Sequence, residues 1–199
     1  YVPIPESEPT TEQVPTYADL ALPLDLPEDV RETPVHLDPS FADYPCCEAY
    51  TYGDPHGVKA RPLLDLEAGD RVYFYATLEA PDDPAGWMAE EWGAYLIGEF
   101  TLARDPVTGE EFRALPEREQ AAFAGNAHLK RDPFDAAVML AGTDDSRRYD
   151  AAVPLSGARG VEANRAVTEW SADSGKGPWW RRPLRYDDAG HDRLREGVQ

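Results

Sequence analysis

Residues 64–76 read LDLEAGDRVYFYA, and residues 92–100 read WGAYLIGEF. The first segment has an aliphatic lead-in, a Gly-Asp turn and an aromatic run, and the second contains a glycine between apolar residues. Their alternation of apolar and polar positions predicts two strands with one well-buried face. Neighbouring strands rich in aromatic rings can form a small curved sheet that holds a planar ligand. Because aromatic rings commonly hold nucleobases by stacking, this pattern favours a nucleobase as that ligand.

The chain has 199 residues, of which 42% are hydrophobic, so it can form one domain with a packed core. We therefore expect a single domain over residues 1–199. No apolar run approaches 18 residues and no signal peptide is visible, which gives no reason to expect a membrane partner. The sequence opens on the strand-like stretch 1–5 rather than on Met, so we expect an N-terminal strand upstream of it.

The formal net charge is −19, with 38 acidic residues and three lysines among 19 basic ones. An acidic, lysine-poor surface stays solvated in concentrated salt, where a Debye length of about 3 Å at 1 M screens its self-repulsion. This composition predicts a cytoplasmic protein of a halophilic archaeon; an acidic protein of an ordinary organism is the alternative. Cys46 and Cys47 are adjacent, and because a vicinal disulfide is strained, we expect two buried or half-buried thiols.

Proline and glycine positions divide the chain into short elements. Residues 1–40 contain eight prolines and are expected to form an extended wrap around the domain. We expect a hairpin turn at 105–109, and Thr143–Arg147 is predicted as a strand-to-helix turn. Further along the chain we expect a helix over 116–123, a buried strand over 136–142, a strand or short helix over 149–155, a helix over 162–170 and a charged tail over 177–199.

Two histidine-containing segments are candidates for chemistry. His36 and Asp38 share one side of an extended chain, where a carboxylate can fix the tautomer of a histidine for acid–base catalysis; a structural hydrogen bond is the alternative. In the second segment Asn126, His128 and Lys130 share a face and could bind a base edge, a phosphate or a carboxylate. We take His36, Asp38 and His128 as candidate catalytic residues.

Candidate nucleotide-binding residues are aromatic rings for stacking and polar groups for base edges and phosphate. Ser146 is included because we expect it near a helix N-terminus, which favours anions. The arginine pairs and Lys130-Arg131 could contact phosphate, or could pair with the abundant carboxylates. The set is Tyr52, Asp54, Tyr73, Tyr75, Asn126, Lys130, Arg131, Ser146 and Arg147.

The histidines lack a metal-ligand spacing such as His-x-x-x-His, and no phosphate-loop, nucleophile-elbow or dinucleotide motif occurs. The sequence therefore predicts neither a metal nor a cofactor.

Short segments spread along the chain resemble, in their order, the nucleotide modification-associated domain family, type three. The segments are 1–6, 36–39, 51–54, 69–70, 95–98, 126–131 and 153–156. The resemblance spans nearly the whole chain and implies a role in systems that modify bases in DNA. Members of that family begin about one strand earlier, so this sequence looks like a member lacking its first segment.

Residues 63–102 are also similar to the barrels of pseudouridine synthases and archaeosine transglycosylases (PUA-like, with their EVE-type base-reading branches). There, a Gly-Asp turn leads into an aromatic strand and an Ile-Gly strand follows. This second resemblance implies an α+β fold: a small mixed or antiparallel β-barrel with a few flanking helices, long irregular proline-rich segments and a pocket for a flipped base.

Three functions remain open. The first, which the sequence favours over the other two, is a module that binds a modified nucleobase, nucleotide or DNA. The second is an enzyme acting on a nucleotide or base through His36, Asp38 and His128. The third is a structural or interaction subunit. An enzyme requires the polar residues of 36–54 and 126–131 to meet in one place. The oligomeric state stays open.

Overall fold

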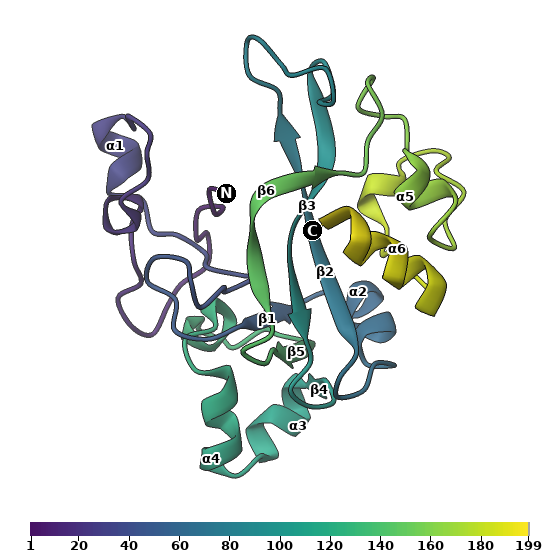
Figure 1. Cartoon of the computed structure of the whole chain (residues 1–199). Helices are drawn as coiled ribbons and strands as arrows, with labels where there is room; N and C mark the ends of the chain where they lie inside the picture. The colour runs from purple at the N-terminus through teal and green to yellow at the C-terminus, as the bar shows by residue number, and fades with distance from the viewer. Residues whose placement is uncertain (199) are drawn as a thin grey trace. The chain divides into compact units, whose positions relative to one another are not determined.

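A computed structural model describes residues 1–198 of the chain as a mixture of short helices and strands (Figure 1). They fall into two compact units, residues 1–72 with 99–148 and residues 73–98 with 149–198. A three-stranded sheet in the order β2–β3–β6 has residues of each strand in both units. Its strands are β2 (Arg71–Glu79), β3 (Trp92–Thr101) and β6 (Arg147–Pro154).

The first unit also contains a second three-stranded sheet, which is antiparallel and has the order β1–β5–β4. Thr51 pairs with Ala141 and Val107 pairs with Met139. The elements of this unit are η1 (Tyr17–Leu20), α1 (Glu28–Arg31), β1 (Thr51–Asp54), α2 (Gly57–Leu63), β4 (Val107–Thr108), α3 (Gly109–Ala114), α4 (Glu117–Gln120), η2 (Ala121–Phe123), η3 (Ala127–Lys130) and β5 (Val138–Ala141).

Strand β5 is buried on both faces, which explains its uninterrupted apolar sequence. Met139 and Ala141 pack with Phe112 and Phe123. The alternate residues, Val138 and Leu140, pack with Ala60 and Leu102. Because side chains of a strand alternate between faces, one short apolar run supplies two hydrophobic clusters.

The first residues of the chain lie as an extended segment along the first unit. His36 N–H donates to the Ile4 carbonyl at 2.9 Å, and Thr11 N–H donates to the Lys130 carbonyl at 2.7 Å. Isolated bridges join Pro5 to Val35 and Thr10 to Arg131. The N-terminal segment is thereby held between the segment that carries His36 and the short helix η3.

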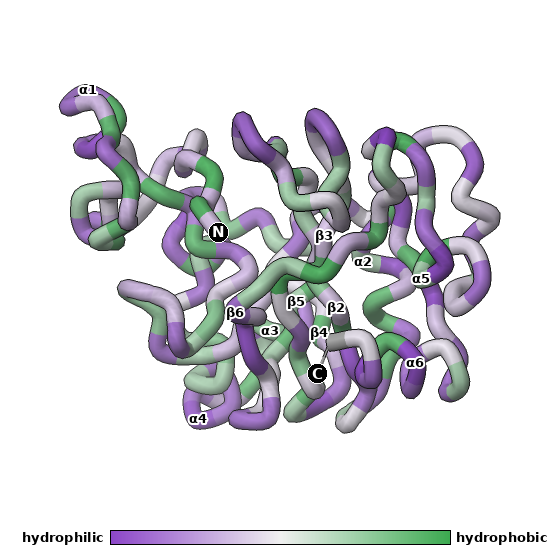
Figure 2. The backbone as a smooth tube through the Cα atoms, turned by 45° about the horizontal axis from the view of Figure 1, so that its top comes forward, coloured by the Kyte–Doolittle hydropathy of each residue, from purple (hydrophilic) through white to green (hydrophobic). Residues whose placement is uncertain are grey.

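The second unit packs around Trp179, which is fully buried among Leu96, Leu155, Val167 and Leu194. Its helices are α5 (Arg165–Thr168), η4 (Trp179–Arg181) and α6 (Asp188–Val198). Figure 2 shows α6 as mostly hydrophilic along the tube, as expected of a helix that buries one narrow face, here with Leu194.

Several predicted elements are confirmed: the two aromatic strands are β2 and β3, the strand over 136–142 is β5, and 149–155 is the strand β6. The helix over 116–123 appears as α4 followed by η2, and the helix over 162–170 appears as the shorter α5.

Other predictions were wrong. Residues 105–109 are not a hairpin turn, because Val107 and Thr108 pair with β5 and Gly109 begins α3. Thr143–Arg147 leads into strand β6 rather than a helix, so Ser146 has no helix N-terminus beside it. Cys46 is an exposed free thiol, whereas Cys47 is half-buried as expected.

The α+β class is confirmed, but the PUA-like barrel is not. Within residues 1–198 the strands form two open sheets of three strands, and neither sheet closes on itself.

Candidate functional site

His128 is positioned by the start of η3. Asn126, fully buried at the N-cap, accepts the His128 backbone N–H at 2.9 Å. Its amide then donates to Oδ1 of Asp38 at 2.8 Å and to the Thr51 hydroxyl at 3.2 Å. One buried side chain therefore links the turn that carries His128 to Asp38 and to strand β1.

Gly53, on β1, allows the His128 ring to lie against the strand backbone. A Cβ at this position would come within 2.6 Å of Cδ2 and 3.1 Å of Cγ of His128. Separations this short do not occur between real carbon atoms, so the ring occupies the space that a side chain would need.

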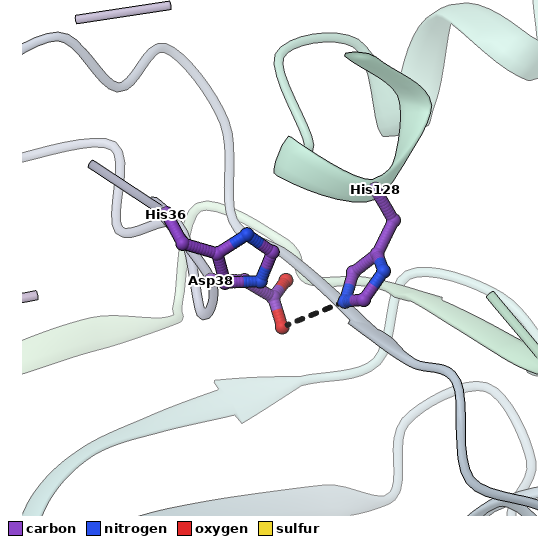
Figure 3. A group of neighbouring side chains, drawn as sticks. All are labelled: His36, Asp38 and His128. Atoms are coloured by element: carbon purple, nitrogen blue, oxygen red, sulfur yellow. Dashed lines mark ion pairs between the residues drawn. The ribbon is translucent and has the colours of Figure 1, made fainter. Parts of the chain in front are cut away.

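Asp38 is buried with its two carboxylate oxygens in different environments. Oδ1 accepts the Gly53 N–H at 2.9 Å and the Asn126 amide at 2.8 Å. Oδ2 faces Nε2 of His128 at 3.8 Å, a separation too long for a hydrogen bond (Figure 3). Burial raises the pKa of Asp38 well above its usual value, although these two hydrogen bonds act in the opposite direction.

His36 and His128 lie edge to face, with ring centroids 4.9 Å apart. Each Nδ1 meets a carboxylate: Oε2 of Glu6 lies 2.7 Å from His36, and Oδ1 of Asp135 lies 2.6 Å from His128. Arg131 Nη2 also lies 3.2 Å from Nδ1 of His36, but the carboxylate is closer, so we assign the proton of each Nδ1 as donated to its carboxylate. In both rings Nε2 is therefore the nitrogen with the free electron pair when the imidazole is neutral.

Arg131 holds both carboxylates. Its guanidinium donates to Glu6 at 2.8 Å and, through Nη1, to Asp135 at 2.8 Å. Burial raises the pKa of Glu6, but the hydrogen bonds, that from Arg131 foremost, outweigh it and lower the value to about 2. Burial also raises the pKa of Asp135, but the hydrogen bonds with His128 and Arg131 outweigh this effect, so the pKa is lowered. Burial lowers the pKa of His36, which favours its neutral form.

A second polar group lies on the same strand as Gly53. The Tyr52 hydroxyl donates to Oδ2 of Asp54 at 2.7 Å, and the half-exposed Lys59 amino group lies 3.6 Å from that oxygen. Burial raises the pKa of the Tyr52 hydroxyl, and the hydrogen bond to Asp54 raises it further. The charge of Asp54 also contributes to the raised pKa of Asp38, so the two groups are electrostatically coupled.

The first unit brings together most of the predicted site residues. His36, Asp38, His128, Asn126 and Arg131 form one cluster, which hydrogen bonds of Asn126, Glu6 and Asp135 hold together. Tyr52 with Asp54 lies beside it. The backbone of Lys130 holds the N-terminal segment.

The remaining predicted binding residues are engaged elsewhere. The Tyr73 hydroxyl hydrogen-bonds His191, and the Tyr75 hydroxyl donates to the Arg182 carbonyl, both within the second unit. These rings pack against the Trp179 core, so they are not an open stacking wall. Ser146 bonds the Thr101 backbone, and Arg147 donates to the buried Glu99.

Two members of the cluster, Glu6 and Asp135, were missed by the sequence reasoning. Asp135 stands four residues after Arg131, a spacing that signals an ion pair on a helix, but residues 131–135 are not helical. Glu6 lies in a proline-rich stretch where nothing local distinguishes it from the other acidic residues.

The sequence also gave no metal motif, yet His36, Asp38 and His128 each offer one ligand atom within 4.8 Å of the others. Within residues 1–198 this is the one group of three or more His, Cys, Asp or Glu side chains close enough to hold a metal ion. It was missed because its members come from segments about 90 residues apart.

The family resemblance was tested by comparison with known proteins. No curated protein and no solved structure matches the chain. Among residues 1–198, no helix combines the length and the apolar character needed to cross a bilayer. A family model, described as nucleotide modification associated domain 3, matches residues 1–196. The expectation drawn from the ordered short segments is confirmed, and this chain belongs to the family of nucleotide modification associated domain 3.

Proposed function

We propose that this chain is an enzyme that acts on a nucleotide or nucleobase, with the His36, Asp38 and His128 side chains as its reactive centre. The observation that carries the proposal is their convergence. They come from two segments about 90 residues apart, they lie within reach of one another, and each is held by hydrogen bonds to groups that do not face the shared space. The family supports a nucleotide as the substrate class.

The proposed chemistry uses the atoms that the surrounding network leaves available. Nε2 of His36, Nε2 of His128 and Oδ2 of Asp38 converge, and together they can take a proton from a water molecule or from a substrate hydroxyl. Asn126, Glu6 and Asp135 hold these groups without approaching the reacting atoms themselves. Such positioning by a rigid surrounding shell is typical of catalytic sites.

Binding of the base or nucleotide is the first step of this reaction. We propose that Tyr52, Asp54 and Lys59 contact the substrate, because they lie on and beside the strand that carries Gly53 and because the Lys59 amino group is half-exposed. Arg131 is too deeply engaged with Glu6 and Asp135 to hold a phosphate, so we assign it a positioning role.

The experiment uses the full chain in concentrated KCl with a panel of deoxynucleotides and oligonucleotides, both modified and unmodified. Binding is measured by calorimetry and turnover by mass spectrometry of the products. We expect His128→Gln and Asp38→Asn to lose turnover by at least about 100-fold, the usual scale of a general acid or base. His56→Gln, which replaces an exposed histidine outside the cluster, should retain it.

The outcomes separate the candidate functions. Binding without turnover by the wild-type chain makes it a recognition module and overturns the enzyme proposal. Unchanged turnover in both cluster variants also overturns it, as does the absence of binding and turnover across the whole panel.

A further inference from the structure

We infer that His36, Asp38 and His128 form a three-ligand site for a divalent first-row transition-metal ion. The inference deepens the proposed function, because it assigns a cofactor to the same site. It stands on four features of the cluster: the tautomers of the two histidines, the shared anchor of their carboxylates, the environment of Asp38, and the separation of the ligand atoms.

The two histidines have the arrangement of metal ligands. Histidines that bind a metal through one ring nitrogen commonly donate the N–H of the other to a carboxylate, which fixes the tautomer and the orientation of the ring. Glu6 and Asp135 accept these N–H groups at 2.7 Å and 2.6 Å. One such pair could be a simple structural hydrogen bond, but here two pairs leave two Nε2 atoms facing a common space (Figure 3).

Arg131 makes this arrangement rigid. Its guanidinium contacts both carboxylates and is itself 11% exposed, so it balances part of their charge inside the protein. One residue thereby helps to orient both imidazoles through their carboxylate partners. Imidazoles that are already oriented bind an ion more tightly, because less ordering remains to be done.

Asp38 supplies the third ligand, an oxygen that binds the ion in the deprotonated form of the carboxyl group. Its side chain is 4% exposed, and the hydrogen bonds from Gly53 and Asn126 both go to Oδ1, whereas Oδ2 faces His128. Burial of a carboxylate is costly unless a cation or hydrogen bonds compensate it. The neighbouring Nε2 of His128, at 3.8 Å, is too distant to donate, but both atoms can bind one ion placed between them.

The spacing fits a metal after a small contraction. Ligands about 2.1 Å from a tetrahedral ion lie roughly 3.4 Å from one another. The three ligand atoms lie within 4.8 Å of one another, so an ion must draw them together by up to about 1.4 Å. Two imidazoles with one carboxylate suit Zn²⁺, Fe²⁺, Co²⁺ or Mn²⁺ rather than Ca²⁺ or Mg²⁺, and leave open positions for water or substrate.

The test is direct binding of Co²⁺ and Zn²⁺ to chelator-treated protein without any nucleotide. Calorimetry gives the affinity and the stoichiometry, and the visible spectrum of Co²⁺ reports its coordination. We expect one ion per chain, with Mg²⁺ unable to compete. His36→Ala and His128→Ala should each weaken binding by at least about 100-fold, while His56→Ala should not change it.

Asp135→Asn is the second variant, and it keeps all three ligands. It should weaken Co²⁺ binding by about 10- to 100-fold, as the loss of an outer-shell carboxylate does. Because Asp135→Asn keeps both imidazoles and Asp38, it is less prone to misfolding than the ligand variants. Thermal unfolding verifies the fold of each variant. No Co²⁺ binding by folded wild-type protein overturns the inference, and so does equal binding by the wild type and the ligand variants.

Failure of this inference is distinguishable from failure of the proposed function. Nucleotide turnover that survives complete chelation overturns the metal site and leaves the enzyme proposal standing. Metal binding that depends on the three ligands, without turnover of any nucleotide, supports the metal site and overturns the enzyme proposal.

Discussion

At the scale of single residues, the site depends on Gly53 as much as on its charged groups. The glycine lies on β1, its N–H donates to Asp38, and its missing side chain leaves room for the His128 ring. It performs two tasks with backbone alone. No charge or motif distinguishes Gly53 in the sequence. Its neighbours Tyr52 and Asp54 are easier to recognise as candidates, because their side chains carry polar groups.

Gly53→Ala should displace the His128 ring, because the new methyl group would lie 2.6 Å from Cδ2. Overpacking of this kind costs about 1–3 kcal/mol of the free energy of unfolding, measured with denaturant. The His128 resonances should shift in NMR spectra. Gly57→Ala, where a Cβ meets nothing within 4 Å, should be neutral or slightly stabilising. Equal stability of the two variants would contradict the close packing of the ring.

Which residues could be predicted follows from how far apart their partners lie. His36 and Asp38 were chosen as candidates because residues two positions apart in an extended chain lie on the same side. This relation can be read from the local sequence. Glu6 could not be found, because it meets Arg131 across 125 positions of the chain. Nothing in the sequence around either residue encodes that meeting. The cluster as a whole is a product of tertiary structure.

At the scale of elements, strong local patterns were predicted well and short mixed ones were not. The apolar run of β5 and the aromatic runs of β2 and β3 are long enough to define strands. Residues 105–109 were misinterpreted because a Pro and a Gly three positions apart, Pro106 and Gly109, resemble a turn. Thr108 in fact ends the two-residue strand β4 and caps helix α3.

Thr108→Ala should destabilise α3 and the first unit. The Thr108 hydroxyl accepts the Glu111 N–H at 3.1 Å, and the Glu111 carboxylate accepts the Thr108 N–H at 2.7 Å. Loss of such a cap costs about 1 kcal/mol of the free energy of unfolding. Glu110→Gln, in the same turn but outside the capping box, should have a smaller effect. A stability loss in Glu110→Gln as large as that in Thr108→Ala would assign the effect to charge rather than to capping.

The segment that follows α5 depends on an ion pair, and its stability should vary with pH. Arg182 donates to Asp173 through two nitrogens, at 2.9 and 2.8 Å, and this lowers the pKa of Asp173. A lowered pKa in the folded state stabilises the fold above the ordinary pKa of 3.8, and the benefit is lost as the pH falls through the lowered value.

The stability difference between wild type and Asp173→Asn should therefore be largest at neutral pH and should shrink below about pH 4. Thermal unfolding across pH 2–7 measures it. Asp150→Asn, at an exposed position on β6, should show a smaller difference at neutral pH. A difference for Asp173→Asn that stays constant down to pH 2 would mean that the ion pair does not stabilise the fold.

At the scale of the whole molecule, net charge follows directly from the sequence, and it depends less on the fold than any other property considered above. A formal charge of −19 on 199 residues opposes compaction through self-repulsion. The Debye length falls from about 10 Å at 0.1 M salt to about 3 Å at 1 M, so salt removes most of the repulsion between separated surface charges. The partly buried cluster of Glu6, Arg131 and Asp135 is screened less.

The melting temperature should therefore rise with KCl concentration, by roughly 2–4 °C for each kcal/mol of repulsion relieved at this chain length. In Asp82→Lys/Asp83→Lys, which alters two exposed acidic residues, the melting temperature should be higher at low salt and should rise less steeply with salt. Parallel salt curves for this variant and the wild type would show that salt acts through hydrophobic burial instead. In that case the acidic composition would contribute to solvation without limiting stability at low salt.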